Sequence, residues 1–192
     1  GNGVKWADIK LILEKFSGIV VVDEAYINFA SYKSLITELP NYPNLVILQT
    51  LSKAWGMAGL RVGMAFASSQ IINVFNKIKP PYNINVVSQQ LAREALDNVG
   101  QVNDFIKEIV EEREKLTVSL KAFAFIKQIY PSEANFLLAK VSDPKKLYDY
   151  LSSKQIIVRD RSKAPLCEGC LRITVGTKEE NKKLLETLNK YS

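Results

Sequence analysis

The sequence predicts an α/β protein, in which part of a mostly parallel, wound sheet is followed by a small α+β domain. Short apolar runs alternate with longer segments whose apolar residues recur at helical spacing. In the first part these runs are apolar at consecutive positions, which predicts strands covered on both faces. Beyond a long helical segment, shorter strands and helices follow one another. We therefore expect two domains, residues 1–116 and 117–192.

The first domain is predicted to open with a helix over 6–16, because its apolar residues recur at helical spacing. A strand over 19–23 follows at once, and the helix-to-strand step is typical of a wound sheet. A longer connection then leads to a buried strand over 45–49. A third strand is expected over 61–67, after a turn that contains Lys53.

The remaining pattern is mainly helical up to residue 123 and mixed after it. The predicted helices of the first stretch span 69–78, 86–96 and 102–123. The predicted elements of the second stretch are strands over 125–129 and 135–140, a helix over 144–154, strands over 156–159 and 171–175, and a terminal helix over 178–191.

Composition limits the class of protein. The chain has 192 residues, of which 47% are hydrophobic and 24% charged, as in an ordinary globular protein. No apolar run is long enough to cross a bilayer and no signal segment opens the sequence, so we expect a cytoplasmic protein without membrane contact. The net charge of +6 comes from lysines mixed with acids, as in 178–183. This pattern favours a solvated helix face and anionic small-molecule ligands over nucleic acid.

Histidine is absent, which excludes Ser-His-Asp and Cys-His catalysis and histidine metal sites. Proton transfer must therefore use Lys, Tyr, Asp, Glu or Cys side chains. Cys167 and Cys170 form a CxxC pair, but no second pair or histidine completes a zinc site. Because the pair precedes a strand and does not open a helix, we interpret both cysteines as structural and expect no metal.

The segment 50–63 carries the main candidate for chemistry. Lys53 stands among small and hydroxyl residues in a glycine-rich turn, where its amine can form a Schiff base with an aldehyde cofactor. Thr50, Ser52 and Arg61 can hold a phosphate attached to that cofactor. A Ser-Lys pair by itself is common and carries little information.

A second motif lies upstream, where the strand over 19–23 ends in Asp23 and is followed by Tyr26. An aspartate at a strand end is more often a turn residue than a ligand. Together with the Lys53 segment, however, it completes the set that pyridoxal 5'-phosphate needs: an amine, an acid for the pyridine nitrogen, a phenol for the ring oxygen and a phosphate cup. Both motifs follow strands, and open α/β sheets bind ligands at the carboxyl ends of their strands.

These two segments resemble the cofactor-binding motifs of fold-type I aminotransferases, which depend on pyridoxal phosphate, and most closely those of the histidinol-phosphate aminotransferase family. The resemblance continues through 79–83, 157–160 and 170–177. It implies that residues 1–116 correspond to the carboxy-terminal half of the cofactor-binding large domain, and that residues 117–192 form the small domain.

The resemblance also implies two substrate-binding residues. In the family, the arginine at the position of Arg172 holds the substrate α-carboxylate, and a guanidinium can grip a carboxylate with two parallel hydrogen bonds. Without the family, Arg172 within an apolar strand could instead pair with a core acid. Arg159 is a candidate for binding a second anionic group of the substrate.

The function that the resemblance implies is transamination between histidinol phosphate and 2-oxoglutarate or glutamate in histidine biosynthesis, in an enzyme that is a homodimer at full length. Alternatives are an aromatic or general amino-acid aminotransferase, a threonine-phosphate decarboxylase, or an inactive structural module. Family members are about twice as long, and their first half supplies a ring-stacking aromatic and a loop over the cofactor phosphate. We therefore expect this chain alone to be a poor catalyst.

Overall fold

The computed structural model describes residues 1–191 and divides into two compact units. One unit is Gly3–Phe105, and the other comprises Gly1–Asn2 and Ile106–Ser192. The division falls inside the long helix α4 (Val99–Leu120). The boundary predicted between residues 116 and 117 lies in the same helix and stays a prediction.

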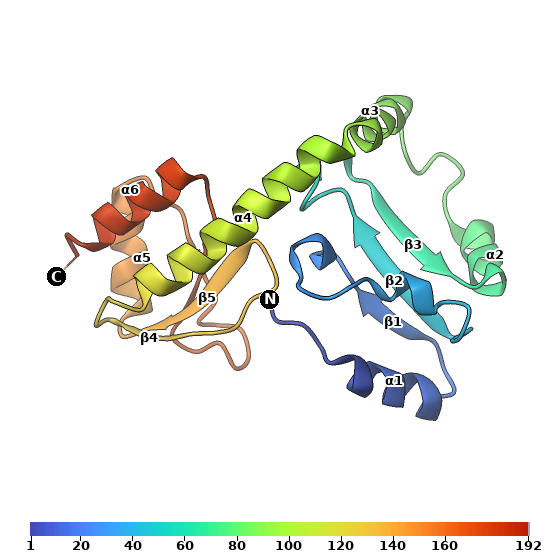
Figure 1. The fold of residues 1–192 in the computed structure, drawn as a ribbon, viewed down its shortest axis with the longest axis horizontal. Coiled ribbons are helices and arrows are strands. Elements are labelled where there is room, and N and C mark those ends of the chain that lie inside the picture. The colour runs from blue at the N-terminus through green and yellow to red at the C-terminus, as the bar shows by residue number, and fades with distance from the viewer. Residues whose placement is uncertain (192) are drawn as a thin grey trace. The chain divides into compact units, whose positions relative to one another are not determined.

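The Gly3–Phe105 unit is built on a mixed three-stranded sheet of order β1-β2-β3 (Figure 1). Strands β1 (Val20–Asp23) and β2 (Leu45–Thr50) run parallel, and β3 (Gly63–Ala67) is antiparallel to β2. The helices of this unit are α1 (Trp6–Lys15), α2 (Ser69–Ile78), α3 (Val86–Asp97) and the first residues of α4. The connection from β1 to β2 contains two 3-10 helices, η1 (Ile27–Phe29) and η2 (Leu35–Glu38).

Only one face of this sheet is well covered along β1. Leu13 of α1 packs on Leu45 and Ile47 of β2 to form a small buried cluster. On the opposite face, Val21 is 56% exposed and Leu48 is 37% exposed. The expectation that these strands are covered on both faces is therefore wrong for β1. Consecutive apolar residues indicate what a strand can bury, whereas the layers present around it decide what is buried.

The Ile106–Ser192 unit contains an antiparallel sheet of order β4-β5-β7-β6. Its helices α4, α5 and α6 cover one face of the sheet, where apolar side chains from all three helices and from β5 and β7 form one core. The bounds of the elements not yet given are β4 (Ile126–Ile129), β5 (Phe136–Val141), α5 (Pro144–Ser153), β6 (Arg159–Asp160), β7 (Cys170–Thr174) and α6 (Lys178–Leu188).

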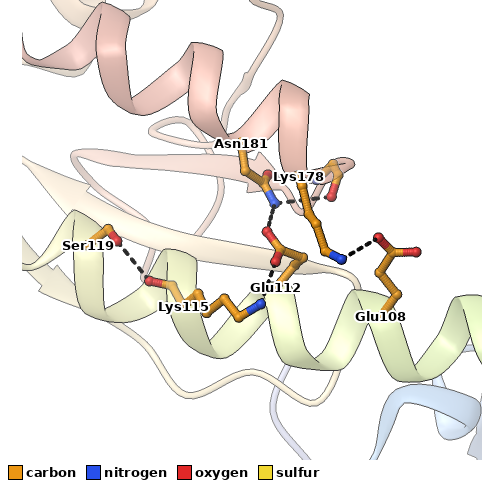
Figure 2. A network of polar contacts seen from close by, with 7 residues as sticks. Glu108, Glu112, Lys115, Ser119, Lys178 and Asn181 are labelled. Carbon is orange, nitrogen blue, oxygen red and sulfur yellow. Dashed lines mark hydrogen bonds and ion pairs between the residues drawn. The ribbon is translucent and has the colours of Figure 1, made fainter.

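A polar network joins the start of α6 to α4 within this unit (Figure 2). Asn181 donates to Glu112 Oε2 at 3.0 Å, and it exchanges hydrogen bonds with the backbone of Gly176, just beyond β7. Thr177 and Glu180 form a capping box that satisfies the first backbone N–H groups of α6. The end of β7 is thus fixed both by the helix cap and by a buried carboxylate.

In the part of the chain that the structure describes, no helix combines the length and the apolar character needed to cross a membrane.

Candidate functional site

The predicted cofactor residues gather at one edge of the Gly3–Phe105 sheet. Because β1 and β2 are parallel, their carboxyl ends, Asp23 and Thr50, lie at the same edge. Strand β3 is antiparallel and begins there, with Gly63 opposite Thr50. The loop 51–62 between β2 and β3 carries Lys53 and Arg61, so the topology places these residues at this edge.

Lys53 and Tyr26 are brought into direct contact. Lys53 Nζ lies 5.3 Å from the centroid of the Tyr26 ring, although the two residues come from different strand-end loops. Lys53 opens a turn in which the N–H of Gly56 donates to the Lys53 carbonyl. Gly56 has φ +67°, a conformation that glycine adopts without steric cost, and the reversal lets the Met57 N–H reach the Leu51 carbonyl. The exposed amine is thereby presented next to a phenol ring.

Asp23 and Glu24 are consecutive acids with different surroundings. The Asp23 carboxylate is exposed, and its Oδ1 accepts a hydrogen bond of 2.9 Å from the Ala25 N–H. Glu24 is only 6% exposed and accepts hydrogen bonds from the Leu35 N–H, the Ser34 hydroxyl and the Gln49 amide. Successive strand residues point to opposite faces, so Asp23 is open to a ligand and Glu24 ties the strand end to the following connection.

Glu24 is not among the residues predicted from the sequence. The signal that could have found it is the pairing of two acids at the end of a strand, since only one of them can face a ligand on a given side of the sheet. The burial of the other carboxylate requires donors, which Ser34 and Gln49 supply from positions that sequence spacing alone does not connect.

Thr50, Ser52 and Arg61 shape the loop that follows β2. The Thr50 hydroxyl donates to the Val62 carbonyl at 3.2 Å and accepts from the Ser52 N–H at 3.0 Å, which closes the base of the loop. Arg61 has φ 58°, a left-handed conformation that costs on the order of 1 kcal/mol for a residue other than glycine. Its Nη1 donates to the Ala58 carbonyl at 2.9 Å. The exposed guanidinium and the hydroxyls give this loop the chemistry of an anion cup.

The two substrate-binding candidates lie in the other unit and form a pair. Arg172 of β7 stands directly opposite Arg159 of β6 in the antiparallel ladder, so both side chains leave the same face of the sheet. Like charges directly opposite each other are destabilising unless an anion lies between them. The two arginines line a cavity of about 470 Å³ together with Tyr148, Ile157, Val158, Asp160 and Thr174.

The electrostatics of this cavity favour an anionic ligand. Arg172 Nε is buried and finds no hydrogen-bond partner among the described residues. Within residues 1–191, neither arginine forms a salt bridge with an acid. The sequence left open that Arg172 pairs with a core acid, and among these residues it does not. Asp160 lines the cavity, and its Oδ1 accepts a hydrogen bond of 2.8 Å from the Ser162 N–H. The contact with Ser162 lowers the pKa of the Asp160 carboxyl, so this group is ionised at neutral pH. Two guanidinium groups beside one carboxylate leave the cavity with a net positive charge.

The two cysteines lie at the turn that leads into β7. Cys170 is fully buried, and both thiols are free. Burial and the neighbouring Cys167 raise the pKa of the Cys170 thiol. The Cys170 N–H donates to the Cys167 carbonyl across the turn. The structural role assigned to the pair stays a prediction.

Residues 4–188 match the family model described as Aminotransferase class I and II. The histidinol-phosphate aminotransferase of Cytophaga hutchinsonii is 54% identical over 191 residues, which cover 100% of this chain and 55% of that protein. The chain therefore spans about half the length of the curated relatives it matches.

Solved structures show the same similarity. The histidinol-phosphate aminotransferase from Clostridium acetobutylicum matches with a TM-score of 0.86 and 27% identity, over 95% of this chain and 56% of that one. The Sinorhizobium meliloti histidinol-phosphate aminotransferase, solved in complex with pyridoxal-5'-phosphate, matches with a TM-score of 0.78 and 24% identity, over 91% of this chain and 50% of that one. The predicted α/β fold class is confirmed by these similarities.

Proposed function

Because the chain belongs to the aminotransferase class I and II family, we propose that it binds pyridoxal 5'-phosphate at Lys53 and takes part in the transamination of histidinol phosphate with 2-oxoglutarate or glutamate. The observation that carries the cofactor assignment is the contact between Lys53 and Tyr26 at the sheet edge where Asp23 ends β1. The substrate assignment is supported by the relatives named histidinol-phosphate aminotransferase. The proposal includes a cytoplasmic location and a homodimer at full length, as the family resemblance implies.

The residues at the edge suit this cofactor in kind and in placement. The cofactor requires an amine, an acid, a phenol and groups that bind a phosphate. Lys53 and Arg61 lie in one loop with Ser52, and Asp23 and Tyr26 lie at the end of the neighbouring parallel strand. The Gly3–Phe105 unit therefore carries one residue or more of each of these four kinds, which supports the proposal.

When bound, pyridoxal 5'-phosphate supplies an aldehyde that condenses with amines and a ring that accepts electrons from the bond being broken. Lys53 Nζ would move the proton between the substrate Cα and C4′ of the cofactor, first as base and then as acid. The Asp23 carboxylate would hold the proton on the pyridine nitrogen, because a nearby negative charge favours the protonated ring. Tyr26 would donate a hydrogen bond to the ring oxygen.

The phosphate would be held by Arg61, with Ser52 and Thr50 as hydroxyl donors. A hydroxyl carries a single proton, and that of Thr50 is directed at the Val62 carbonyl. Thr50 would therefore have to turn from Val62 in order to donate to a phosphate, whereas Arg61 can add a bond through donors other than the one that holds Ala58. We accordingly assign Arg61 the largest share of phosphate binding.

Arg172 would bind the α-carboxylate of glutamate, and Arg159 would bind a second anionic group, either the side-chain carboxylate of glutamate or the phosphate of histidinol phosphate. Two observations support these separate roles: the arginines lie opposite each other on neighbouring strands, and both line the same cavity. One positively charged pair can thus serve both substrates of the reaction, because both are anionic: glutamate carries two carboxylates, and histidinol phosphate carries a phosphate on the carbon next to the one that bears the amine.

The cofactor proposal is tested by incubating the chain with pyridoxal 5'-phosphate, reducing with borohydride and mapping the attached pyridoxyl group by peptide mass spectrometry. We expect the label on Lys53, and its loss in Lys53→Ala with the fold unchanged. Lys10→Ala, which removes an exposed lysine from α1, is the matched control and should keep the label. Labelling of another lysine in the unaltered chain would contradict the assignment.

A further inference from the structure

Within residues 1–191, Arg172 has no acidic partner that fixes its guanidinium. Its direct cross-strand neighbours on the same face are Leu138 and Arg159, and neither can accept a hydrogen bond through its side chain. Its buried Nε is likewise unpartnered in this part of the chain. A guanidinium that must meet a carboxylate in a bidentate geometry still needs something to hold its orientation, since a long free side chain loses rotamer entropy on binding.

The contact that the structure provides is an aromatic ring. Arg172 Cζ lies 5.0 Å from the centroid of the Phe136 ring. Phe136 precedes Leu138 by two residues in β5, so it lies on the same face as Arg172 and diagonal to it across the β5–β7 ladder. A ring face attracts a cation through its quadrupole and occupies none of the five N–H donors of the guanidinium.

We propose that Phe136 is a positioning residue for Arg172, which holds the guanidinium over its ring and leaves the N–H fork free for the carboxylate of the substrate. The inference rests on the carboxylate-binding role proposed for Arg172. A carboxylate side chain in place of the ring would hold the arginine more strongly, but it would use the same donors and neutralise the same charge as the substrate. An aromatic ring orients the cation without competing for it.

The backbone that carries the ring is held by the sheet. Phe136 pairs with Thr174 in the β5–β7 ladder, and its carbonyl accepts a hydrogen bond of 2.6 Å from the Ser132 hydroxyl. The backbone of Phe136 is therefore fixed by the ladder with β7 and by the hydrogen bond from Ser132. Phe136 and Arg172 belong to β5 and β7, the two central strands of the same sheet. The orientation of Arg172 follows from strand register and does not depend on a mobile loop.

The test is an NMR titration of the chain with glutarate, a dicarboxylate probe, at constant ionic strength. Phe136→Leu keeps an apolar side chain but removes the ring, and we expect it to raise the Kd for glutarate roughly threefold to thirtyfold, the range of a cation–π contact between exposed and desolvated settings. Phe136→Tyr restores a ring face and should bind within about twofold of the unaltered chain. Phe123→Leu removes a ring that stacks on Phe125 in the same unit and should leave the Kd unchanged.

The free energy of unfolding is measured for each variant, because a purely structural role would lower binding only through loss of folded protein. A Kd unchanged by Phe136→Leu, together with binding lost in Arg172→Lys, would overturn the positioning role and leave the carboxylate role of Arg172 standing. Glutarate binding that survives Arg172→Lys would overturn the carboxylate role, and the positioning role with it.

Discussion

The two units differ in how much of their apolar surface they bury. Among the described residues, 18 of the 21 exposed large hydrophobic side chains lie in Gly3–Phe105, and 15 of the 23 buried hydrophobic residues lie in Gly1–Asn2 and Ile106–Ser192. The unit that carries the proposed substrate arginines has a closed core beneath its sheet. The unit that carries the proposed cofactor residues has a sheet with an exposed apolar face and, in the described chain, an unpaired edge at β1. An exposed apolar face and an unpaired strand edge favour association with another layer of protein.

The largest expected effect follows from separating the units. Residues 106–192 expressed alone should fold as a monomer with a cooperative urea transition, because their core is complete. Residues 3–105 alone should self-associate, because the exposed face and edge have no cover. Size-exclusion chromatography and urea unfolding measure both. If residues 3–105 form a monodisperse monomer that unfolds cooperatively, the exposed face and edge do not need a cover, and the two units do not differ in stability as expected.

A matched pair of leucine substitutions probes the same difference at single positions. Leu171 is fully buried in β7, and Leu91 in α3 is 40% exposed. Leu171→Ala should lower the free energy of unfolding by about 2–5 kcal/mol, because it leaves a cavity in a closed core. Leu91→Ala should change it by less than about 0.5 kcal/mol. The free energy of unfolding of both variants is measured by urea titration. Equal decreases in the two variants would contradict the prediction and show that Leu91 is packed as tightly as Leu171.

The sequence predicted most elements of both units, because apolar periodicity depends on local spacing. It placed helices α1, α2, α5 and α6 and strands β2 and β7 within a few residues. The strand predicted over 156–159 is reduced to Arg159–Asp160. Gln155 takes a left-handed conformation after α5 and the Ile156 N–H donates to the Leu151 carbonyl, so the chain turns back before it can pair.

The candidate site was predictable where its residues lie in short motifs, and unpredictable where it depends on strand register. Asp23, Tyr26 and Lys53 follow strands whose parallel pairing was expected, and the structure brings them to one edge. The contact between Phe136 and Arg172 joins residues that are far apart in the sequence and requires the exact pairing of β5 with β7. Spacing within one strand shows which residues share a face, but it does not show which residue of the neighbouring strand lies opposite each of them.

An intermediate effect is expected from a matched pair of asparagine substitutions. Asn181 is buried and donates hydrogen bonds to Glu112 and to the Gly176 carbonyl (Figure 2). The Asn41 amide, in contrast, donates to Glu38 at the surface. Asn181→Ala should cost about 1–3 kcal/mol of unfolding free energy, because it leaves a buried carboxylate without one of its donors. Asn41→Ala should cost less than about 0.5 kcal/mol. Chemical denaturation of both variants tests this, and a loss at Asn41 as large as that at Asn181 would contradict it.

The smallest expected effect is a dependence of stability on pH in the 106–192 unit. Hydrogen bonds from Lys115 and then Asn181 lower the pKa of Glu112 below its ordinary value of 4.5. A group whose pKa is lower in the folded state contributes stability above its unfolded pKa, and this contribution is lost as the pH falls through the folded value.

We therefore expect the unfolding free energy of the 106–192 piece to decline below about pH 4.5, and Glu112→Gln to flatten that decline. Lys115→Ala removes the largest cause of the shift and should flatten it partly. Lys145→Ala breaks an exposed ion pair with Asp149 in α5, on a different helix from Glu112, and should leave the contribution of Glu112 in place. Urea unfolding at a series of pH values measures the slope for each variant. An acid decline that persists unchanged in Glu112→Gln would mean that other carboxylates set the acid stability of this unit, and that the link between α4 and α6 contributes to stability without making it depend on pH.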